Sequence, residues 1–386
     1  MKLVGYLFLF FSLSSLAQSQ FGRSEIFLRE PQTLVSLYDK NSYFVNDTVF
    51  TQYQKIEIGI ELPSEIAQKV DLFIKTNGEQ GTNPYLEWEL AVKVIFTHEQ
   101  TQETDTIDAF YYQNFRRYNN YEGDNLPKPK NGIGYSDKEY QNLGDWELTP
   151  TAYQFVARFV AMKFGQWNYQ VVIEQGEEHV YFPQKTFVVN ENKTNPFIKI
   201  SPQGRFLEHQ NTIFQPIGCN ISWPETKMAF DSVFLSYNQW QDDKGVKHVL
   251  PENYRRITVA PRVYEKYNEY VLKMNRYGAN WFRIIMSPQS SDIEFEELGN
   301  YTKRLHQAYE LDSLVSLAEA NDFFLHWCMQ IHYTFKNKVY SITDWDWDDT
   351  EGTNVYAYKK AFNLNKPVDF FKSEDAKKYY KQRMRY

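Results

Sequence analysis

The sequence predicts two domains, an N-terminal antiparallel β-sandwich followed by an incomplete (β/α)8 TIM barrel of about three β/α units. Residues 35–189 show short runs with an apolar side chain at every second position, whereas residues 214–386 alternate apolar strands with helical repeats. The length of 386 residues also exceeds one ordinary domain of roughly 100–200 residues. We assign the sandwich to residues 18–190, a linker with a hairpin to 191–213, and the barrel to 214–386.

Period-two alternation predicts the strands of the first domain, because it is typical of antiparallel strands with one buried face. The stretch of residues 111–144 is rich in Asn, Tyr, Gly and Pro and predicts a long loop, either a mobile excursion or a lid. Several short strands without helical periodicity favour a sandwich. The predicted strands are Ile56–Leu62, Leu90–Phe96, Phe155–Ala161 and Trp167–Ile173.

A polar segment separates the two domains. Residues 190–196 end in an Asn-Pro pair, which is a turn signal. Residues 197–200 and 205–208 then predict a small hairpin before the second domain begins.

Continuous apolar strands and amphipathic helices predict the second domain, because parallel strands buried on both faces are typically apolar throughout. A closed (β/α)8 barrel needs eight units over roughly 250 residues, so we expect a truncated barrel with exposed strand edges. Ser373 is expected to cap a last helix in which Ala376, Tyr379, Tyr380 and Met384 share a face. The predicted strands are Phe214–Ile221, Trp281–Met286 and Phe323–Ile331, and the helical repeats are Val263–Met274 and Leu311–Ala318.

The N-terminus predicts a signal peptide over residues 1–17. Lys2 precedes an apolar run, and Ser15 and Ala17 are the small residues of a cleavage site. No later apolar run approaches the roughly 20 residues of a spanning helix, so we expect export to the periplasm or beyond without a membrane anchor. Cys219 and Cys328 lie in apolar patterns and predict buried free thiols, with a disulfide as the less favoured alternative.

The composition excludes several classes of protein. With 42% hydrophobic residues, 24% charged residues and a net charge of -7, the chain is neither disordered nor a nucleic-acid binder. Aromatic residues make up 17% of it, which suits either a β-rich core or surfaces that stack on sugars. No nucleophile elbow, Walker loop, zinc motif or metal-spaced cysteine pair is present, so we assign no cofactor and no metal.

Several segments carry a family resemblance. FIKISPQGRFLEHQNTIFQPIGCN at residues 197–220 resembles the junction in multidomain polysaccharide-degrading enzymes of gut and marine bacteria. In those enzymes a sandwich called domain of unknown function 5060 precedes a barrel of the broad glycoside hydrolase family 5 type. The resemblance covers nearly the whole mature chain and implies hydrolysis of O-glycosidic bonds in polysaccharides. It extends to KIEIGIEL (55–62), NPY (83–85), YGANWFRIIM (277–286), ELGNYTKR (297–304), LDSLVSLAEANDFFLHW (311–327) and DFF (369–371).

The resemblance implies substrate-binding residues on the barrel strands. The Gly-x-Asn-x-x-Arg pattern at residues 278–283 matches, and its Arg283 would reach the nucleophilic carboxylate in a bidentate bond. His332 would follow the third strand and bind substrate. The alternative for Arg283 is an ion pair inside the barrel. Asn220 and Trp223 lie near the end of the first strand, where an amide and a ring face would meet a sugar.

The resemblance places the catalytic acids after strands four and seven, beyond Tyr386. Retaining glycosidases need two carboxylates about 5–5.5 Å apart, so we assign no catalytic residue and expect this chain to be inactive alone. The acidic run at residues 344–349 suits a glycan subsite, a calcium site or a solvated loop, and we assign it no metal. The acidic residues expected on a surface loop and helix start are Asp292, Glu294, Glu296 and Glu297.

Three functional hypotheses follow. The first is a truncated polysaccharide-degrading glycoside hydrolase with a polysaccharide or oligosaccharide as partner. The alternative is a non-catalytic glycan-binding or scaffold protein. The third is assembly with a second polypeptide that carries the remaining barrel units.

Overall fold

The computed structural model describes residues 22–29, 44–46, 49–117, 146–148, 151, 153–221, 233–236, 239–241, 247–249, 263–286, 292–294, 297–330, 335 and 357–386. Trp223, His332, the acidic run at 344–349 and the signal peptide at 1–17 lie outside these residues. Within the described part of the chain, no helix has both the length and the apolarity to cross a membrane.

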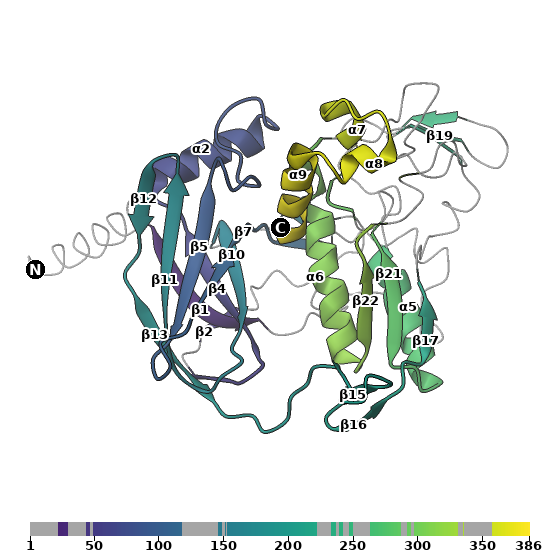
Figure 1. The fold of residues 1–386 in the computed structure, drawn as a ribbon. Helices are drawn as coiled ribbons and strands as arrows, with labels where there is room; N and C mark the ends of the chain where they lie inside the picture. Colours follow the sequence, from purple (N-terminus) through teal and green to yellow (C-terminus); the bar gives the residue numbers. More distant parts are fainter. Residues whose placement is uncertain are drawn as a thin grey trace, which may run out of the picture.

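Two sheets form the first unit (Figure 1). The five-stranded sheet has the antiparallel order β2-β1-β4-β10-β7. The six-stranded sheet has the order β3-β13-β11-β5-β6, with β12 paired to β11, and only β3 runs parallel to its neighbour. The strands are β1 (Arg23–Arg29), β2 (Phe44–Asn46), β3 (Val49–Thr51), β4 (Lys55–Glu61), β5 (Ala91–His98), β6 (Thr104–Asp108), β7 (Phe110–Tyr111), β10 (Phe155–Val160), β11 (Gly165–Gln175), β12 (Glu178–Tyr181) and β13 (Lys185–Asn190).

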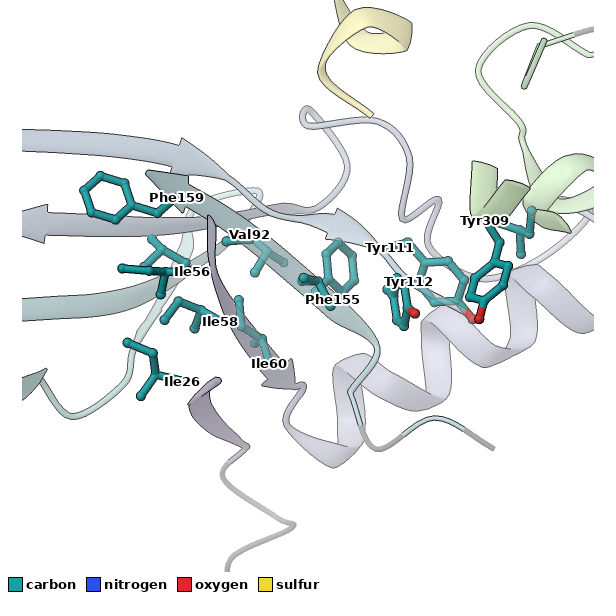
Figure 2. Packing of buried hydrophobic residues seen from close by; sticks show 14 of the residues in the cluster. Ile26, Ile56, Ile58, Ile60, Val92, Tyr111, Tyr112, Phe155, Phe159 and Tyr309 are labelled. Atoms are coloured by element: carbon teal, nitrogen blue, oxygen red, sulfur yellow. The ribbon is translucent and has the colours of Figure 1, made fainter. Parts of the chain in front are cut away.

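The two sheets face each other across one apolar core. Ile56, Ile58 and Ile60 of β4 are fully buried, as the alternation predicts, and Figure 2 shows them in a row. Phe96 of β5 stacks on Phe159 of β10 with ring centroids 4.0 Å apart and planes 8° apart. The strands β4, β5, β10 and β11 therefore lie where the sequence predicts them, while the assignment of the whole unit to the sandwich class stays a prediction.

A helix that the sequence interpretation missed covers one end of this unit. Helix α2 (Ser64–Lys75) buries Ile66, Val70 and Phe73, which are spaced for one helical face. Gly81 follows with a φ of +96°, and a Cβ atom there would lie 2.2 Å from the Lys69 carbonyl oxygen. Only glycine fits this close approach of the chain to α2.

Part of the predicted long loop is ordered as strand. Tyr111 belongs to β7, and β8 (Phe115–Arg117) pairs with β9 (Trp146–Leu148). Residues 118–145 lie outside the described part of the chain. A separate small sheet contains β18 (Val233–Ser236), β19 (Gln239–Gln241) and β20 (Lys247–Val249).

The predicted hairpin is present and carries a third strand. Strands β14 (Lys199–Ile200), β15 (Leu207–His209) and β16 (Thr212–Phe214) form an antiparallel sheet. The continuous strand predicted over Phe214–Ile221 is wrong. β16 ends at Phe214 and a new strand begins at Gly218, because the first half pairs with the hairpin and the second half with a different sheet.

Three parallel strands in the order β17-β21-β22 form the second unit's sheet, and the two helices between them pack on one face. Phe282 of β21 lies between Tyr267 and Phe323, with ring centroids 6.2 Å and 5.7 Å away. No sheet in the described residues closes on itself, and the incomplete-barrel class stays a prediction. The elements are β17 (Gly218–Asn220), α5 (Val263–Arg276), β21 (Trp281–Ile285), the short 3-10 helix η3 (Thr302–Arg304), α6 (Leu305–Ala320) and β22 (Phe324–Cys328).

Three further helices follow β22, namely α7 (Ala357–Ala361), α8 (Pro367–Phe370) and α9 (Glu374–Arg385). Ser373 caps α9 as predicted, since its side chain accepts a hydrogen bond from the Ala376 amide at 3.2 Å. The predicted apolar face of α9 is partly wrong. Met384 is 42% exposed, whereas the neighbouring Arg383 is buried.

The two units contact each other directly, with α6 and α9 on the side of the second unit that faces the first (Figure 1). Tyr85 of the first unit packs against Tyr301 and Tyr386, with centroids 5.1 Å and 5.4 Å away. Arg158 of β10 donates to Asp312 of α6 through both terminal guanidinium nitrogens, Nη1 at 2.7 Å and Nη2. An aromatic group and an ion pair therefore join the two units.

The two cysteines lie on opposite faces of the parallel sheet. Cys219 is in register with Phe282 on the helix side, whereas Cys328 is in register with Ile285 on the other side. This arrangement excludes a disulfide between them. The predicted burial is wrong for Cys219, which is exposed although its Sγ lies 3.4 Å from the Met274 Sδ.

Candidate functional site

The parallel sheet has a second face that the described helices do not cover. Asn220, Arg283 and His326 are in register across the three strands, so their side chains share this face. Along β21, Phe282 and Ile284 are buried against the helices, whereas Arg283 is only half-buried. The expected burial of these strands on both faces is therefore wrong among the described residues, since His326 is exposed.

Arg283 brings an unused donor to this face. Its Nη2 donates to the Cys328 Sγ at 3.4 Å. Its Nε is buried and has no hydrogen-bond partner within the described part of the chain. Buried guanidinium nitrogens normally donate a hydrogen bond, so we expect this atom to bind an oxygen acceptor. The alternative of an internal ion pair for Arg283 finds no carboxylate partner among the same residues.

Asn220 lies at the carboxyl end of β17 with an exposed side chain. The backbone there is fixed, since the Ile221 amide donates to the Arg283 carbonyl at 2.8 Å and the Tyr267 hydroxyl donates to the Ile221 carbonyl at 3.0 Å. The strand end is therefore rigid while the amide of Asn220 remains accessible. Ligands of parallel α/β folds bind at this carboxyl edge.

The other two residues of the Gly-x-Asn-x-x-Arg pattern, Gly278 and Asn280, stabilise the local backbone conformation. The Asn280 side chain accepts from the Ile217 amide at 2.9 Å and donates to the Gln215 carbonyl at 3.1 Å. Gly278 takes a φ of +76° at the turn after α5. Asn280 and Gly278 therefore set the amino end of the sheet, and only Arg283 of the three reaches the candidate site.

The hairpin sheet closes the opposite end of the same face. His209 and Phe214 pack edge-on against Phe324, with ring centroids 5.1 Å and 4.9 Å away. Phe324 is in register with Trp281 at the amino end of the strands. As far as the described residues go, this aromatic group covers the amino end and not the carboxyl edge, which carries Asn220 and Arg283.

Two of the acidic residues after β21, Asp292 and Glu294, are buried, which corrects the expectation of a surface loop for these two; Glu297 is half-buried, and Glu296 lies outside the described residues. Glu294 accepts hydrogen bonds from the Gly299 amide at 2.8 Å and from the Tyr358 hydroxyl at 2.7 Å. Asp292 forms an ion pair with Arg383 at 2.8 Å. Burial raises the pKa of Glu294 to about 7, although Arg383, Gly299 and Tyr358 act in the opposite direction. Both carboxyl groups are thus engaged inside the protein.

The structure brings together two of the four predicted substrate-binding residues, Arg283 and Asn220. Trp223 and His332 lie outside the described residues, so their roles stay predictions. Sequence reasoning missed His326 and Cys328, which the alternation of side chains along β22 places on the face of Arg283. The described residues contain no cluster of His, Cys, Asp and Glu suited to a metal ion.

Comparison with known proteins gives weak structural similarity to glycoside hydrolases. No protein-family profile and no curated protein matches the chain. A candidate glycoside hydrolase from Bacteroides vulgatus ATCC 8482 aligns with a TM-score of 0.36 and 11% identity over 73% of this chain. A GH5 xyloglucanase from Bacteroides ovatus, in complex with a XXXG heptasaccharide, aligns with a TM-score of 0.14 and 9% identity over 62% of this chain. The chain spans 41% and 42% of the lengths of these two proteins.

Proposed function

We propose that this chain is a secreted carbohydrate-active protein of glycoside hydrolase lineage that binds a polysaccharide or oligosaccharide at the carboxyl edge of its parallel sheet. The observation that carries the proposal is the buried, unpartnered Nε of Arg283 beside the exposed amide of Asn220. The family resemblance of the sequence supports the lineage. The N-terminal pattern of residues 1–17 supports export to the periplasm or the extracellular space.

The chemistry of these side chains suits a glycan. The guanidinium nitrogen of Arg283 can only donate, and the Asn220 amide both donates and accepts. Sugar hydroxyl groups also do both, so neighbouring hydroxyls can satisfy the two side chains together. We further propose the architecture of a β-sandwich followed by an incomplete (β/α)8 barrel, which the facing sheets and the three parallel strands support.

Binding, rather than turnover, is the role proposed for this chain. Hydrolysis of an O-glycosidic bond requires an acid and a nucleophile at the sugar. Among the acidic residues described between β21 and α6, Asp292 and Glu294 are bound by Arg383, Gly299 and Tyr358, and Glu297 accepts hydrogen bonds from Asn77 and Asn300. The purified chain should therefore release no new reducing ends from a polysaccharide that it binds. Release at a rate above that of a buffer blank would contradict this part of the proposal.

Affinity electrophoresis tests the proposal directly. The purified chain is run through native gels that contain xyloglucan, mixed-linkage β-glucan, mannan or xylan. Retardation is expected in at least one gel, and Arg283→Met should weaken it about tenfold, which corresponds to about 1.4 kcal/mol. Arg205→Met is the matched control, because Arg205 is exposed in the hairpin turn at the other end of the molecule. No retardation in any gel, or equal retardation of both variants, would overturn the proposed function.

A further inference from the structure

A side chain of the first unit holds the loop that follows β21. Asn83 is 6% exposed, and its Nδ2 donates to the Gly299 carbonyl at 3.0 Å. Its Oδ1 accepts from the Tyr85 amide at 2.9 Å, and its backbone amide donates to Glu89 at 3.0 Å. Asn83 is therefore fixed within its own unit before it reaches the loop.

Gly299 lies at a position that strongly favours glycine. Its φ is +69°, and a Cβ atom would lie 2.9 Å from both Leu86 Cδ2 and Tyr379 Cε1. Leu86 belongs to the first unit and Tyr379 to α9. The loop therefore passes through a tight space between the two units, and Gly299 uses both its amide and its carbonyl there.

Glu294 continues the connection on the other side of Gly299. One carboxylate oxygen accepts from the Gly299 amide and the other accepts from the Tyr358 hydroxyl of α7, and all of Glu294 is buried. An unbroken series of hydrogen bonds thus runs from Asn83 through Gly299 and Glu294 to Tyr358. The series joins the first unit, the connection between β21 and α6, and the segment after β22.

We propose that Asn83 and Glu294 are positioning residues of the carbohydrate site, so that the two-sheet unit is a working part of that site. They contact no ligand themselves and act through residues 292–294 and 297–300, which lie between the strand of Arg283 and α6 in the sequence. Loops at the carboxyl edge of parallel strands are mobile unless they are held, and misplacement by about 1 Å weakens a binding site strongly. The inference rests on the proposed function.

Hydrogen exchange measures the positioning step without a ligand. In Asn83→Ala the amides of residues 297–301 should exchange about tenfold faster than in the wild type. Asn195→Ala is the matched control, because Asn195 also accepts a hydrogen bond from the amide two residues on but lies in the linker. Glu294→Ala, which loses both acceptors, should accelerate exchange more than Glu294→Gln, which keeps one. Unchanged exchange in both Asn83→Ala and Glu294→Ala would overturn the inference.

The affinity for the polysaccharide identified by electrophoresis tests the functional step. Asn83→Ala should raise the Kd about fivefold while its circular dichroism spectrum matches that of the wild type, and Asn195→Ala should leave the Kd unchanged. Faster exchange with an unchanged Kd would show that the contact is only structural and would overturn the positioning role. If the wild type itself binds no polysaccharide, the proposed function fails, and the exchange data alone still decide whether the first unit fixes the loop.

Discussion

The carboxylate of Asp292 and the guanidinium of Arg383 form an ion pair of 2.8 Å whose side chains are only 7% and 3% exposed. The pair joins the connection after β21 to helix α9. Arg304 reinforces the same connection by donating to the Asp292 carbonyl at 2.9 Å. The connection between β21 and α6 and the distant helix α9 therefore meet at one buried charged group.

Arg383→Met should strongly destabilise the protein. The variant leaves the Asp292 carboxylate buried beside Glu294 without its cation, and loss of one partner of a buried pair costs about 3–5 kcal/mol. Urea unfolding followed by tryptophan fluorescence measures the change. Lys377→Met is the control, since its partner Glu374 is 85% exposed, and it should leave the unfolding curve unchanged. Equal curves for Arg383→Met and the wild type would contradict a structural role for the buried pair.

Glu294 should make stability depend on pH. Its pKa of about 7 in the folded protein lies above the ordinary value of 4.5, so the folded state keeps this proton at pH values where the unfolded state has lost it. The contribution to stability is complete below pH 4.5, falls as the pH rises to about 7, and is level above. The loss amounts to roughly 3 kcal/mol, because each pKa unit corresponds to about 1.4 kcal/mol.

Glu294→Gln tests this prediction because glutamine does not titrate. The difference in unfolding free energy between the variant and the wild type should shift by roughly 3 kcal/mol in favour of the variant between about pH 4.5 and pH 7.5. Urea titrations at these two pH values give the difference. Parallel profiles for the two proteins would show that Glu294 does not titrate in this range.

Arg158→Met should loosen the two units from each other. Burial alone would lower the pKa of Arg158, but Asp312 and Glu57 outweigh it and the pKa is raised, so the guanidinium stays charged. Its loss leaves two carboxylates facing each other across the boundary and should cost about 2–3 kcal/mol. Calorimetry should then show two separate transitions in place of a more cooperative one. Arg23→Met, which removes an exposed pair within the first unit, should leave the transitions together.

Phe96→Ala tests the packing between the two sheets. The ring stacks on Phe159 and is fully buried, so its removal should leave a cavity and cost roughly 3–5 kcal/mol. Phe164→Ala removes the same side chain from a position that is 55% exposed and should change stability by less than about 0.5 kcal/mol. Urea unfolding of both variants gives the comparison, and similar values would argue against the shared core.

Local patterns predicted much of the fold. The alternation around Ile58 and Tyr169 located their strands, and Ser373 located the start of α9 because a cap acts within one helical turn. Helix α2 was missed although Ile66, Val70 and Phe73 carry the helical spacing, because its polar residues resemble the neighbouring loops. The break after Phe214 was also missed, since an apolar run does not show which sheet each half joins.

The placement of the candidate site residues could be predicted only in part. That Arg283 and Asn220 lie side by side could be predicted, because strand order brings the carboxyl ends of neighbouring parallel strands together. The burial of Glu294 could not, because it depends on Arg383 and Tyr358, which approach only after the chain has folded. From the sequence alone, an acidic stretch predicts a solvated loop, because the distant residues that bind its carboxylates are not known.

The central claim is that a carbohydrate binds at the carboxyl edge of the parallel sheet. Its most direct test is hydrogen exchange of the wild type with and without the polysaccharide that retards the protein in the gels, or an oligosaccharide derived from it. The account predicts slower exchange on binding at residues 218–221, 281–286 and 324–330, which form the three parallel strands and their carboxyl ends. Slower exchange confined to the outer sheet of the first unit, over residues 165–181, would contradict a carbohydrate site on the parallel sheet.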